Sequence, residues 1–315
     1  SNMKDSGFDV GLLAFGNTEC SKLMSTINAV QGYICHPPAV AEAASIQINR
    51  NVEYQSIIGF GGAFTEAAAN NFFKLSKEIQ DYVIEMYFGD GEEGEDSGIN
   101  FTLGRIPINS CDFSVESYSF DDQSGDFALN YFDTELTHDT KTMIPFMKLA
   151  IEKSNSRLRL LASPWSPPKW MKQPYNGVQS MNHSASPLGL IDDHATKTVW
   201  ANYISKWVQS YSDLEVPIWA VTPQNEPEFD APWESCKWSK EGERDWVADY
   251  LGPILKHNHP ELKILGYDHN KENLYKWAKV LLDNTDIEEK SSKEWLDSIA
   301  FHWYSGSGSD RMLDG

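Results

Sequence analysis

Apolar runs and amphipathic stretches alternate along most of the chain. The runs typical of buried strands cover residues 57–65, 101–108, 158–165, 218–222, 264–267 and 299–304. Between these runs, apolar side chains recur at helical spacing in residues 77–88, 140–153, 196–211, 241–256 and 272–282. Apolar strands that alternate with amphipathic helices predict an α/β protein whose parallel sheet is either doubly wound or closed as a barrel.

The first part of the chain does not share this alternation. Residues 45–49 have the pattern of a separate strand, and residues 37–38 are two consecutive prolines. We therefore expect residues 1–50 to be an N-terminal segment that contributes to an accessory β-domain, as part of a β-sandwich. Residues 51–315 carry the alternating pattern and form the main domain.

The glycine pattern favours a barrel over a doubly wound sheet. A doubly wound nucleotide-binding fold needs a phosphate loop, and the glycine cluster at residues 59–62 lacks both the third glycine of a dinucleotide loop and the Lys-Ser/Thr pair of a P-loop. The chain also contains no G-x-S-x-G motif, which is typical of α/β serine hydrolases. In a barrel, functional side chains collect at the C-terminal ends of the strands, and that is where candidate chemistry is sought.

Charge and hydrophobicity exclude two classes of partner. The 315 residues include 26 Lys and Arg against 46 Asp and Glu, which gives a formal net charge of −20 and repels nucleic-acid phosphates. No apolar stretch approaches the roughly 18 residues that a membrane-spanning helix requires. No secretory signal is visible at the first residues. The sequence thus predicts neither nucleic-acid binding nor a membrane span, and it does not indicate an oligomeric state.

The cysteines and histidines do not form a zinc motif. The four cysteines include no C-x-x-C pair, and the eight histidines include no H-E-x-x-H, so no metal site is predicted. Cys111 and Cys236 are interpreted as buried free thiols. Cys20 and Cys35 are close enough in sequence to form a disulfide in an oxidising compartment, and the alternative that both are free stays open.

The predicted strand ends carry side chains suited to carbohydrate. The candidates are Glu66, Arg105, Trp165, Asn225, Glu226, Asp268, His269, His302 and Tyr304. Indole and phenol rings stack on the C–H faces of a sugar ring, while carboxylates and amides bind its hydroxyls. Structural alternatives exist as well: Arg105 could be a buried ion-pair partner, and Glu66 could simply begin a helix. The tryptophans at 200, 207 and 277 lie in predicted helices and are expected in the core.

One run is more specific than the others. Residues 219–227 form an apolar strand that ends in Asn-Glu-Pro, which places the carboxylate of Glu226 at the rim beside Asn225. Here the chain resembles glycoside hydrolase family 30, the retaining β-glycosidases that include glucosylceramidases. The resemblance covers roughly residues 45–305 and is carried by four further motifs, at 58–69, 105–114, 161–172 and 300–304.

The resemblance implies a (β/α)8 TIM barrel and a role for each matching residue. Glu226 is the general acid/base, and Asn225 holds the sugar 2-hydroxyl or the nucleophile. Glu66, Trp165 and Tyr304 line the sugar pocket, although many glucosylceramidase-like members have Asp where this chain has Glu66. The same resemblance implies that Arg105 and His302 support the carboxylates. The chemistry requires no metal and no organic cofactor.

The strand count departs from the complete family pattern. Only about six βα units can be placed before Gly315, so strands seven and eight, the nucleophile glutamate that family members carry on strand seven, and the C-terminal β-domain are expected to be absent. The carboxylates of Glu228, Asp230 and Glu234 follow Glu226 on one loop and would not face it across a sugar. We therefore expect a truncated glycosidase that is inactive as this fragment.

The resemblance also implies a substrate, for which alternatives stay open, and the charge and a sequon indicate a location. Residues 110–114 and 118–120 resemble the glucosylceramidase branch, which implies glucosylceramide or another β-glucoside as substrate, contact with a membrane surface, and a role in sphingolipid metabolism. The alternatives are a β-1,6-glucanase or β-xylosidase of the same family, or a non-catalytic sugar- or lipid-binding protein. The acidic charge and the sequon at Asn182 favour a lysosomal or secreted protein.

Overall fold

The computed structural model describes residues 49–90, 98–283 and 291–305. The chain divides into two units, Ser1–Ile58 and Gly59–Gly315. In the first unit, the described residues 49–58 form no helix or strand. The predicted accessory β-element of residues 1–50 lies almost entirely outside the described residues and stays a prediction, as does the fate of the cysteines at 20 and 35.

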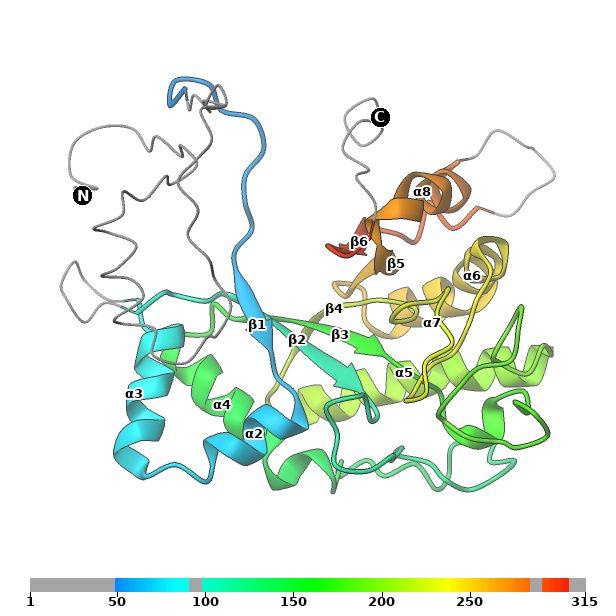
Figure 1. Cartoon of the computed structure of the whole chain (residues 1–315), viewed down its shortest axis with the longest axis horizontal. Coiled ribbons are helices and arrows are strands. Elements are labelled where there is room, and N and C mark those ends of the chain that lie inside the picture. Colours follow the sequence, from blue (N-terminus) through cyan, green and yellow to red (C-terminus); the bar gives the residue numbers. More distant parts are fainter. Residues whose placement is uncertain (1–48, 91–97, 284–290, 306–315) are drawn as a thin grey trace, which may run out of the picture. The chain divides into compact units, whose positions relative to one another are not determined.

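Six parallel strands form the sheet of the second unit, and all six predicted strands are confirmed. They are β1 (Gly61–Ala63), β2 (Leu103–Ile108), β3 (Arg159–Pro164), β4 (Ile218–Val221), β5 (Lys263–Asn270) and β6 (Ser298–His302). The strands pair in chain order from β1 to β6, which the colours of Figure 1 follow from blue to red. A doubly wound sheet reverses its strand order at a switch point, whereas a barrel does not. The sheet is therefore an incomplete (β/α)8 barrel.

Helices fill the connections between the strands. They are α2 (Glu66–Phe72), α3 (Lys77–Phe88), α4 (Met143–Lys153), α5 (His194–Asp213), α6 (Lys240–Trp246), α7 (Gly252–Asn258) and α8 (Leu274–Leu282). The single helix predicted at 241–256 is instead α6 and α7 joined by the π turn Val247–Leu251. Pro253 at the start of α7 lacks the N–H that a continuous helix would use there. At seven residues, α2 is too short to show helical periodicity in the sequence.

Side-chain caps fix where four helices begin. The oxygens of Thr65, Ser76, Asp193 and Ser239 each accept a hydrogen bond from a backbone N–H in the first turn of α2, α3, α5 and α6. Each capped N–H has no partner within its own helix, so the cap satisfies a group that would otherwise need water. The polar residue before each apolar pattern is thus the local signal that starts the helix.

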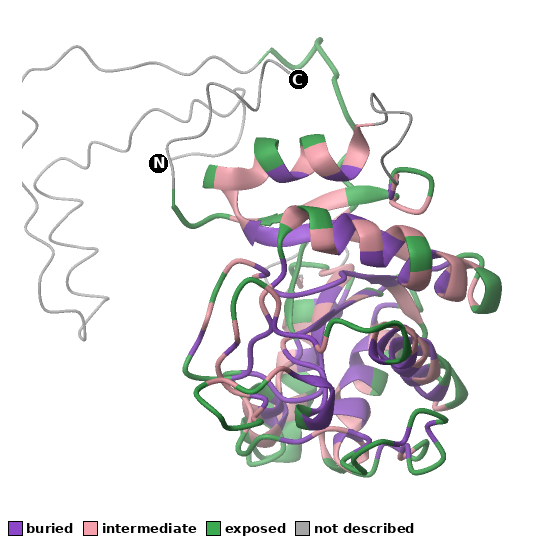
Figure 2. Cartoon of the chain, turned by 90° about the vertical axis from the view of Figure 1, so that its right-hand side faces the viewer, coloured by how far each residue is buried: buried purple, intermediate pink, exposed green. Residues whose placement is uncertain are grey.

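The core lies between the sheet and the helices that follow its strands. Figure 2 shows buried residues along the strands and the inner faces of the helices, with exposed residues on the outer helix faces. On α5, Trp200, Trp207 and Tyr211 are completely buried. Trp277 of α8 is buried as well, so the prediction that the helical tryptophans belong to the core is confirmed. The predicted buried free thiols at 111 and 236 are also confirmed.

The two outer strands are the least buried part of the sheet. All three residues of β1 are exposed, and β6 contains no fully buried residue. By contrast, four of the six residues of β2 and four of the six of β3 are buried. Burial thus rises from the edges of the sheet toward its middle strands. The part of the chain that the structure describes contains no helix that is both long enough and apolar enough to cross a membrane.

Replacing the cap of α5 tests how much one side chain stabilises this core helix. Asp193 accepts a hydrogen bond from the Thr196 N–H at 2.6 Å. Asp193→Ala should lower the free energy of unfolding by about 1 kcal/mol, because the N–H loses its partner. Asp192→Ala is the matched control, since the neighbouring carboxylate is exposed and pairs with Lys197 at the surface; its effect should stay within about 0.5 kcal/mol. Urea denaturation measures both, and equal losses would contradict the capping role.

Candidate active site

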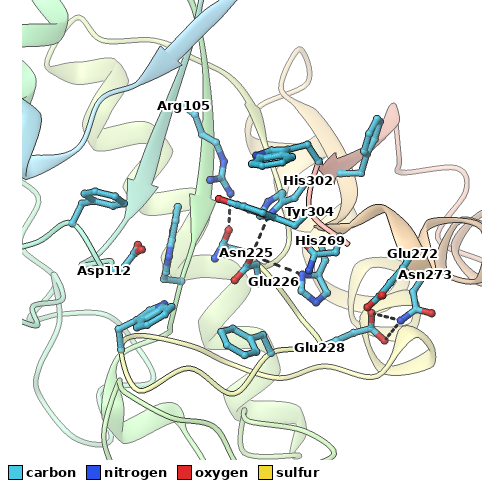
Figure 3. Close-up of a pocket in the computed structure, with 17 residues that line it drawn as sticks. Arg105, Asp112, Asn225, Glu226, Glu228, His269, Glu272, Asn273, His302 and Tyr304 are labelled. Atoms are coloured by element: carbon cyan, nitrogen blue, oxygen red, sulfur yellow. Dashed lines mark hydrogen bonds and ion pairs between the residues drawn. The ribbon is translucent and has the colours of Figure 1, made fainter. Parts of the chain in front are cut away.

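The polar residues at the strand ends meet in one pocket. Arg105 lies on β2, Trp165 follows β3, Glu226 follows β4, His269 lies near the end of β5, and His302 ends β6. All five line a pocket of about 1020 Å³, seen in close-up in Figure 3. Parallel strands bring their carboxyl ends to the same edge of the sheet, so residues far apart in sequence converge there. The pocket is therefore a candidate active site.

The loop after β4 holds Glu226 in an unusual backbone conformation. Glu226 has φ +51°, and its N–H donates to the Asp268 carbonyl oxygen at 3.0 Å. The N–H of Asn225 donates to the Pro164 carbonyl oxygen at 2.8 Å. These two bonds tie the loop to the ends of β5 and β3. A non-glycine residue in the left-handed region costs energy, and such strain clusters at functional sites.

Asp268 is the buried centre of the polar network. The Arg105 guanidinium donates to the Asp268 carboxylate at 2.8 Å and to the Asn225 side-chain oxygen at 2.8 Å. The hydroxyls of Ser163 and Thr222, from β3 and the residue after β4, each lie 2.8 Å from the same carboxylate. Asp268 is 3% exposed, so these partners replace the water that its charge has lost.

His302 joins Asp268 to Glu226. One ring nitrogen, Nε2, lies 2.9 Å from the Asp268 carboxylate, and the other, Nδ1, lies 3.1 Å from Glu226 Oε1. Burial lowers the pKa of His302, but the hydrogen bonds to the two carboxylates raise it to about 9. The imidazole is thus charged at neutral pH and donates through both nitrogens.

The positive charge of His302 lowers the pKa of both Glu226 and Asp268. The hydrogen bond from His302 holds the pKa of Glu226 below its usual range, although burial acts against it. Burial also raises the pKa of Asp268, but the charge of Arg105 and the hydrogen bond from His302 hold it well below its usual range. Both groups are therefore ionised around one cation bridge. The arrangement can orient Glu226 for proton exchange with a molecule in the pocket.

Aromatic rings surround this polar centre. The Arg105 guanidinium lies 4.7 Å from the centre of the Trp165 ring, and Tyr304 lies next to Trp303 with 4.7 Å between ring centres. Both Trp165 and Tyr304 line the pocket, as the carbohydrate interpretation predicts. Such rings can stack on sugar faces while the carboxylates and amides bind hydroxyls.

The structure brings six of the seven predicted site residues together. Glu226, Asn225, Trp165, Tyr304, Arg105 and His302 line the pocket. Glu66 does not: it is buried at the start of α2, where its Oε2 accepts from the Val115 N–H at 2.9 Å and its Oε1 lies 3.5 Å from His138. The alternative interpretation of Glu66 as a first-turn helix residue fits this position. Arg105 is both an ion-pair partner and a pocket residue, which combines the two interpretations.

Sequence reasoning did not assign roles to three further residues of the site. Asp112 and His269 line the pocket, and Asp268 is a buried partner of Arg105 and His302. Asp268 and His269 were recognisable only as polar residues that end a predicted strand, and Asp112 stood inside a motif without any signal of its own. Burial raises the pKa of Asp112, and the charge of Glu226 raises it further. The Nδ1 atom of His269 lies 4.0 Å from Glu226 Oε1. Spatial proximity to Glu226 is what identifies Asp112 and His269.

The other carboxylates of the β4 loop have partners elsewhere. Asp230 accepts from the Ser184 N–H at 2.8 Å, and Glu234 accepts from the Ser110 hydroxyl at 2.9 Å. Neither lines the pocket. Glu228 does line it, and its carboxylate accepts from the Asn273 amide at 3.0 Å. The expectation that these groups do not oppose Glu226 stays a prediction, with two of them now placed outside the pocket.

A buried glutamate shapes the end of β5. Glu243 of α6 is completely buried, and its Oε1 accepts from the Tyr267 N–H at 2.8 Å. At Tyr267 and Asp268 the backbone has φ +76° and +65°, and the register with β6 shifts between Tyr267 and His269. Burial raises the pKa of Glu243 to about 8. Glu243 thus supports the bulge at which Asp268 reaches Arg105 and His302 and His269 lines the pocket.

A carboxylate and two aromatic rings at the C-terminal ends of the strands of a barrel sheet lie where TIM-barrel enzymes place their active sites. The chain belongs to glycosyl hydrolase family 30: the model of the family's TIM-barrel domain matches residues 57–315.

Named relatives agree with the family. The chain is 35% identical over 275 residues to "Putative glucosylceramidase 3" of Caenorhabditis elegans, which covers 85% of this chain and 49% of the relative. It is 34% identical over 256 residues to the "Lysosomal acid glucosylceramidase" of Mus musculus, and the match covers 80% of this chain and 46% of the relative. The solved structure of "The endo-beta1,6-glucanase BT3312" superimposes with a TM-score of 0.70 at 28% identity, covering 82% of this chain and 54% of the other. The chain spans about half the length of the curated relatives it matches.

The ionisation of Glu243 provides a test of the β5 bulge. Its folded pKa lies above the unfolded value of 4.5, so the folded state holds the proton that the unfolded state releases, and stability falls as pH rises from about 4.5 to about 8. Glu243→Gln cannot ionise, so its stability relative to the parent should rise between about pH 5 and about pH 8. Glu241→Gln, on the exposed face of the same helix, is the control and should not show that rise. Melting temperatures at both pH values measure this, and a constant difference for Glu243→Gln would contradict it.

Proposed function

We propose that the whole protein is a retaining β-glycosidase that hydrolyses the β-glucosidic bond of glucosylceramide, with Glu226 as general acid/base. The placement of Glu226 is the main support. Its carboxylate lies in the pocket at the C-terminal end of β4, with a side chain that is 21% exposed and hydrogen-bonded to His302. A carboxylate in this position can contact a bound molecule while its hydrogen bond to His302 fixes its orientation.

The proposed cycle assigns two proton transfers to Glu226. Before the first step, the negative charge of a second carboxylate raises the pKa of Glu226, so that Glu226 takes up a proton from solvent. Glu226 then donates this proton to the glycosidic oxygen as the bond to the sugar breaks and the second carboxylate bonds to the sugar carbon. In the second step Glu226 accepts a proton from water, whose oxygen replaces that carboxylate on the sugar. Retention requires the two carboxylates to be about 5–5.5 Å apart. We propose that the nucleophile is none of the carboxylates that follow Glu226 on its loop. Asp230 and Glu234 are hydrogen-bonded away from the pocket, and Glu228 accepts from the Asn273 amide.

The remaining pocket residues receive supporting roles. Asn225, Trp165 and Tyr304 contact the sugar, and Arg105 and His302 orient the carboxylates through Asp268. Glu66 acts from a distance, since it holds the backbone of Val115 beside the pocket residue Phe113. No metal or organic cofactor takes part in this chemistry.

A β-1,6-glucanase is the second candidate. One structural relative carries that activity in its name, and its fold superimposes with a TM-score of 0.70. Both substrates present a β-glucosyl unit to the inner pocket, and they differ in the group to which that unit is bonded. A β-xylosidase activity and a non-catalytic sugar- or lipid-binding role have no comparable observation in their favour.

The proposed location is a lysosomal or extracellular compartment, with the enzyme at a membrane surface that holds its glycolipid substrate. The name of the mouse relative and the net charge of −20 support it. The sequon at Asn182 supports it less, because that side chain accepts a hydrogen bond from the Ser117 hydroxyl at 3.2 Å.

Substitution of the acid/base gives the sharpest test of the mechanism. In the whole protein, Glu226→Gln should leave the first step on aryl β-glucosides with good leaving groups nearly unchanged, because such groups depart without a proton. The second step still needs a base, so a covalent sugar–enzyme intermediate should accumulate and azide should restore turnover. With glucosylceramide the variant should lose about 10²–10⁴-fold in turnover. Burst kinetics and mass spectrometry measure these effects, with Glu241→Gln as the matched control because Glu241 is exposed on α6 outside the pocket.

The substrate panel separates the candidates. Parent protein is assayed on glucosylceramide, a β-1,6-glucan and aryl β-xyloside. Preference for the glucan would replace the proposed substrate while leaving the mechanism in place. Unchanged glucosylceramide turnover by Glu226→Gln would show that the acid/base is another residue. A parent that binds glucosides without hydrolysing them would favour the non-catalytic alternative.

A further inference from the structure

Three metal-ligating side chains meet at the ends of neighbouring strands. Glu226 follows β4, His269 lies on β5, and His302 ends β6. One ligand atom from each, a carboxylate oxygen and two ring nitrogens, lies within 4.8 Å of the other two. Figure 3 shows the three side chains directed toward one another in the pocket. Two imidazoles and one carboxylate form a donor set that suits a divalent transition-metal ion.

The side chain of His269 has a buried nitrogen without a hydrogen-bond partner in the described part of the chain. The residue is 8% exposed, and its buried Nδ1 has no hydrogen-bond partner among the described residues. This atom lies 4.0 Å from Glu226 Oε1, which is too far for a hydrogen bond and close enough to share an ion. Buried polar atoms in folded proteins normally have partners, and an exception can mark a site whose ligand is absent.

His302 already has the environment of a metal-binding histidine. Its Nε2 faces the Asp268 carboxylate at 2.9 Å while its Nδ1 faces Glu226. Histidines that bind metal commonly donate their second ring N–H to a carboxylate, which fixes the ring and makes the free nitrogen a better ligand. Asp268 is itself held by Arg105, so this outer support is rigid.

We propose that Glu226, His269 and His302 bind a divalent transition-metal ion of the Zn²⁺ class. Tetrahedral zinc with bonds of about 2.0–2.1 Å needs ligand atoms roughly 3.3 Å apart. The His302–Glu226 distance of 3.1 Å meets this. The His269–Glu226 distance of 4.0 Å and a third separation within 4.8 Å require the His269 ring to move by up to about 1.5 Å. The ion takes the place of the proton between His302 and Glu226.

The charge of the pocket favours a cation. Asp112, Glu228 and Glu272 line it together with Glu226, and Arg105 is the single lysine or arginine among its described lining residues. An ion bound here occupies the Glu226 oxygen that the proposed glycosidase needs, so it acts as an inhibitor that competes with substrate. The inhibition rests on the proposed function, whereas the binding rests only on the three side chains.

Calorimetry of zinc binding tests the site without any substrate. The whole protein, freed of metal by chelation, is titrated with ZnCl₂ and separately with MgCl₂. We expect one zinc equivalent that His269→Leu and Glu226→Gln each weaken by at least about tenfold. His257→Gln is the matched control, because His257 is exposed on α7, outside the pocket. Magnesium should not bind this site, since it prefers oxygen ligands.

Each result decides the proposal. Loss of the same zinc equivalent in both variants, with the control unchanged, supports it. Parent protein that binds no zinc at millimolar concentration overturns it, and so does parent-like affinity in Glu226→Gln. If His269→Leu does not melt cooperatively, the zinc affinity of Glu226→Gln alone tests the site, because glutamine has nearly the same shape as glutamate. Zinc that binds without raising the KM for an aryl β-glucoside would keep the ion site and overturn the inferred competition with substrate. The acid/base role is decided separately, by glucosylceramide turnover in Glu226→Gln.

Discussion

The buried charge of Asp268 is the constraint on which the active-site end of the sheet depends. A carboxylate that is 3% exposed must replace its lost water, and it does so with Arg105 from β2, hydroxyls from β3 and the residue after β4, and His302 from β6. One residue of β5 thereby joins β2, β3, β6 and the residue after β4. Removing any single partner would leave part of that charge unpaired, which is costly in a low-dielectric interior. The polar network therefore fixes the relative positions of the strand ends that carry Glu226.

The same constraint explains the irregular end of β5. A regular strand alternates its side chains between the two faces of the sheet, so the side chains of Asp268 and His269 would point to opposite faces. The positive φ values at Tyr267 and Asp268 break this alternation, and Glu243 holds the freed Tyr267 N–H. Asp268 can then reach Arg105 and His302 while His269, the next residue, lines the pocket. A buried carboxyl on a neighbouring helix thus stabilises strain that the site requires.

Much of the barrel could be predicted because its signals are local. Buried parallel strands are continuous apolar runs, and all six appear in the sequence within a few residues of their observed ends. Glu226 was identifiable because Asn and Pro flank it at the end of such a run. Asp268 and His269 could be named as polar residues at a strand end but given no role. Their roles depend on contacts with residues 163 and 43 positions away in the chain, Arg105 and Glu226 respectively. Glu66 shows the converse: it stands in a matching motif, but its carboxylate holds the Val115 backbone outside the pocket.

Under the proposed function, the arrangement of the pocket separates recognition of the sugar from recognition of the group attached to it. Ionised and amide groups lie deep, around Glu226 and Asn225, where they can match sugar hydroxyls and reject molecules that lack them. The rim instead carries exposed rings, Phe229, Trp233 and Trp303, which can pack on a lipid chain or on a second sugar with little distinction. A β-glucosyl unit is common to both candidate substrates. Selection between them must therefore arise at the rim, where small changes in ring position alter the fit without disturbing the charged centre.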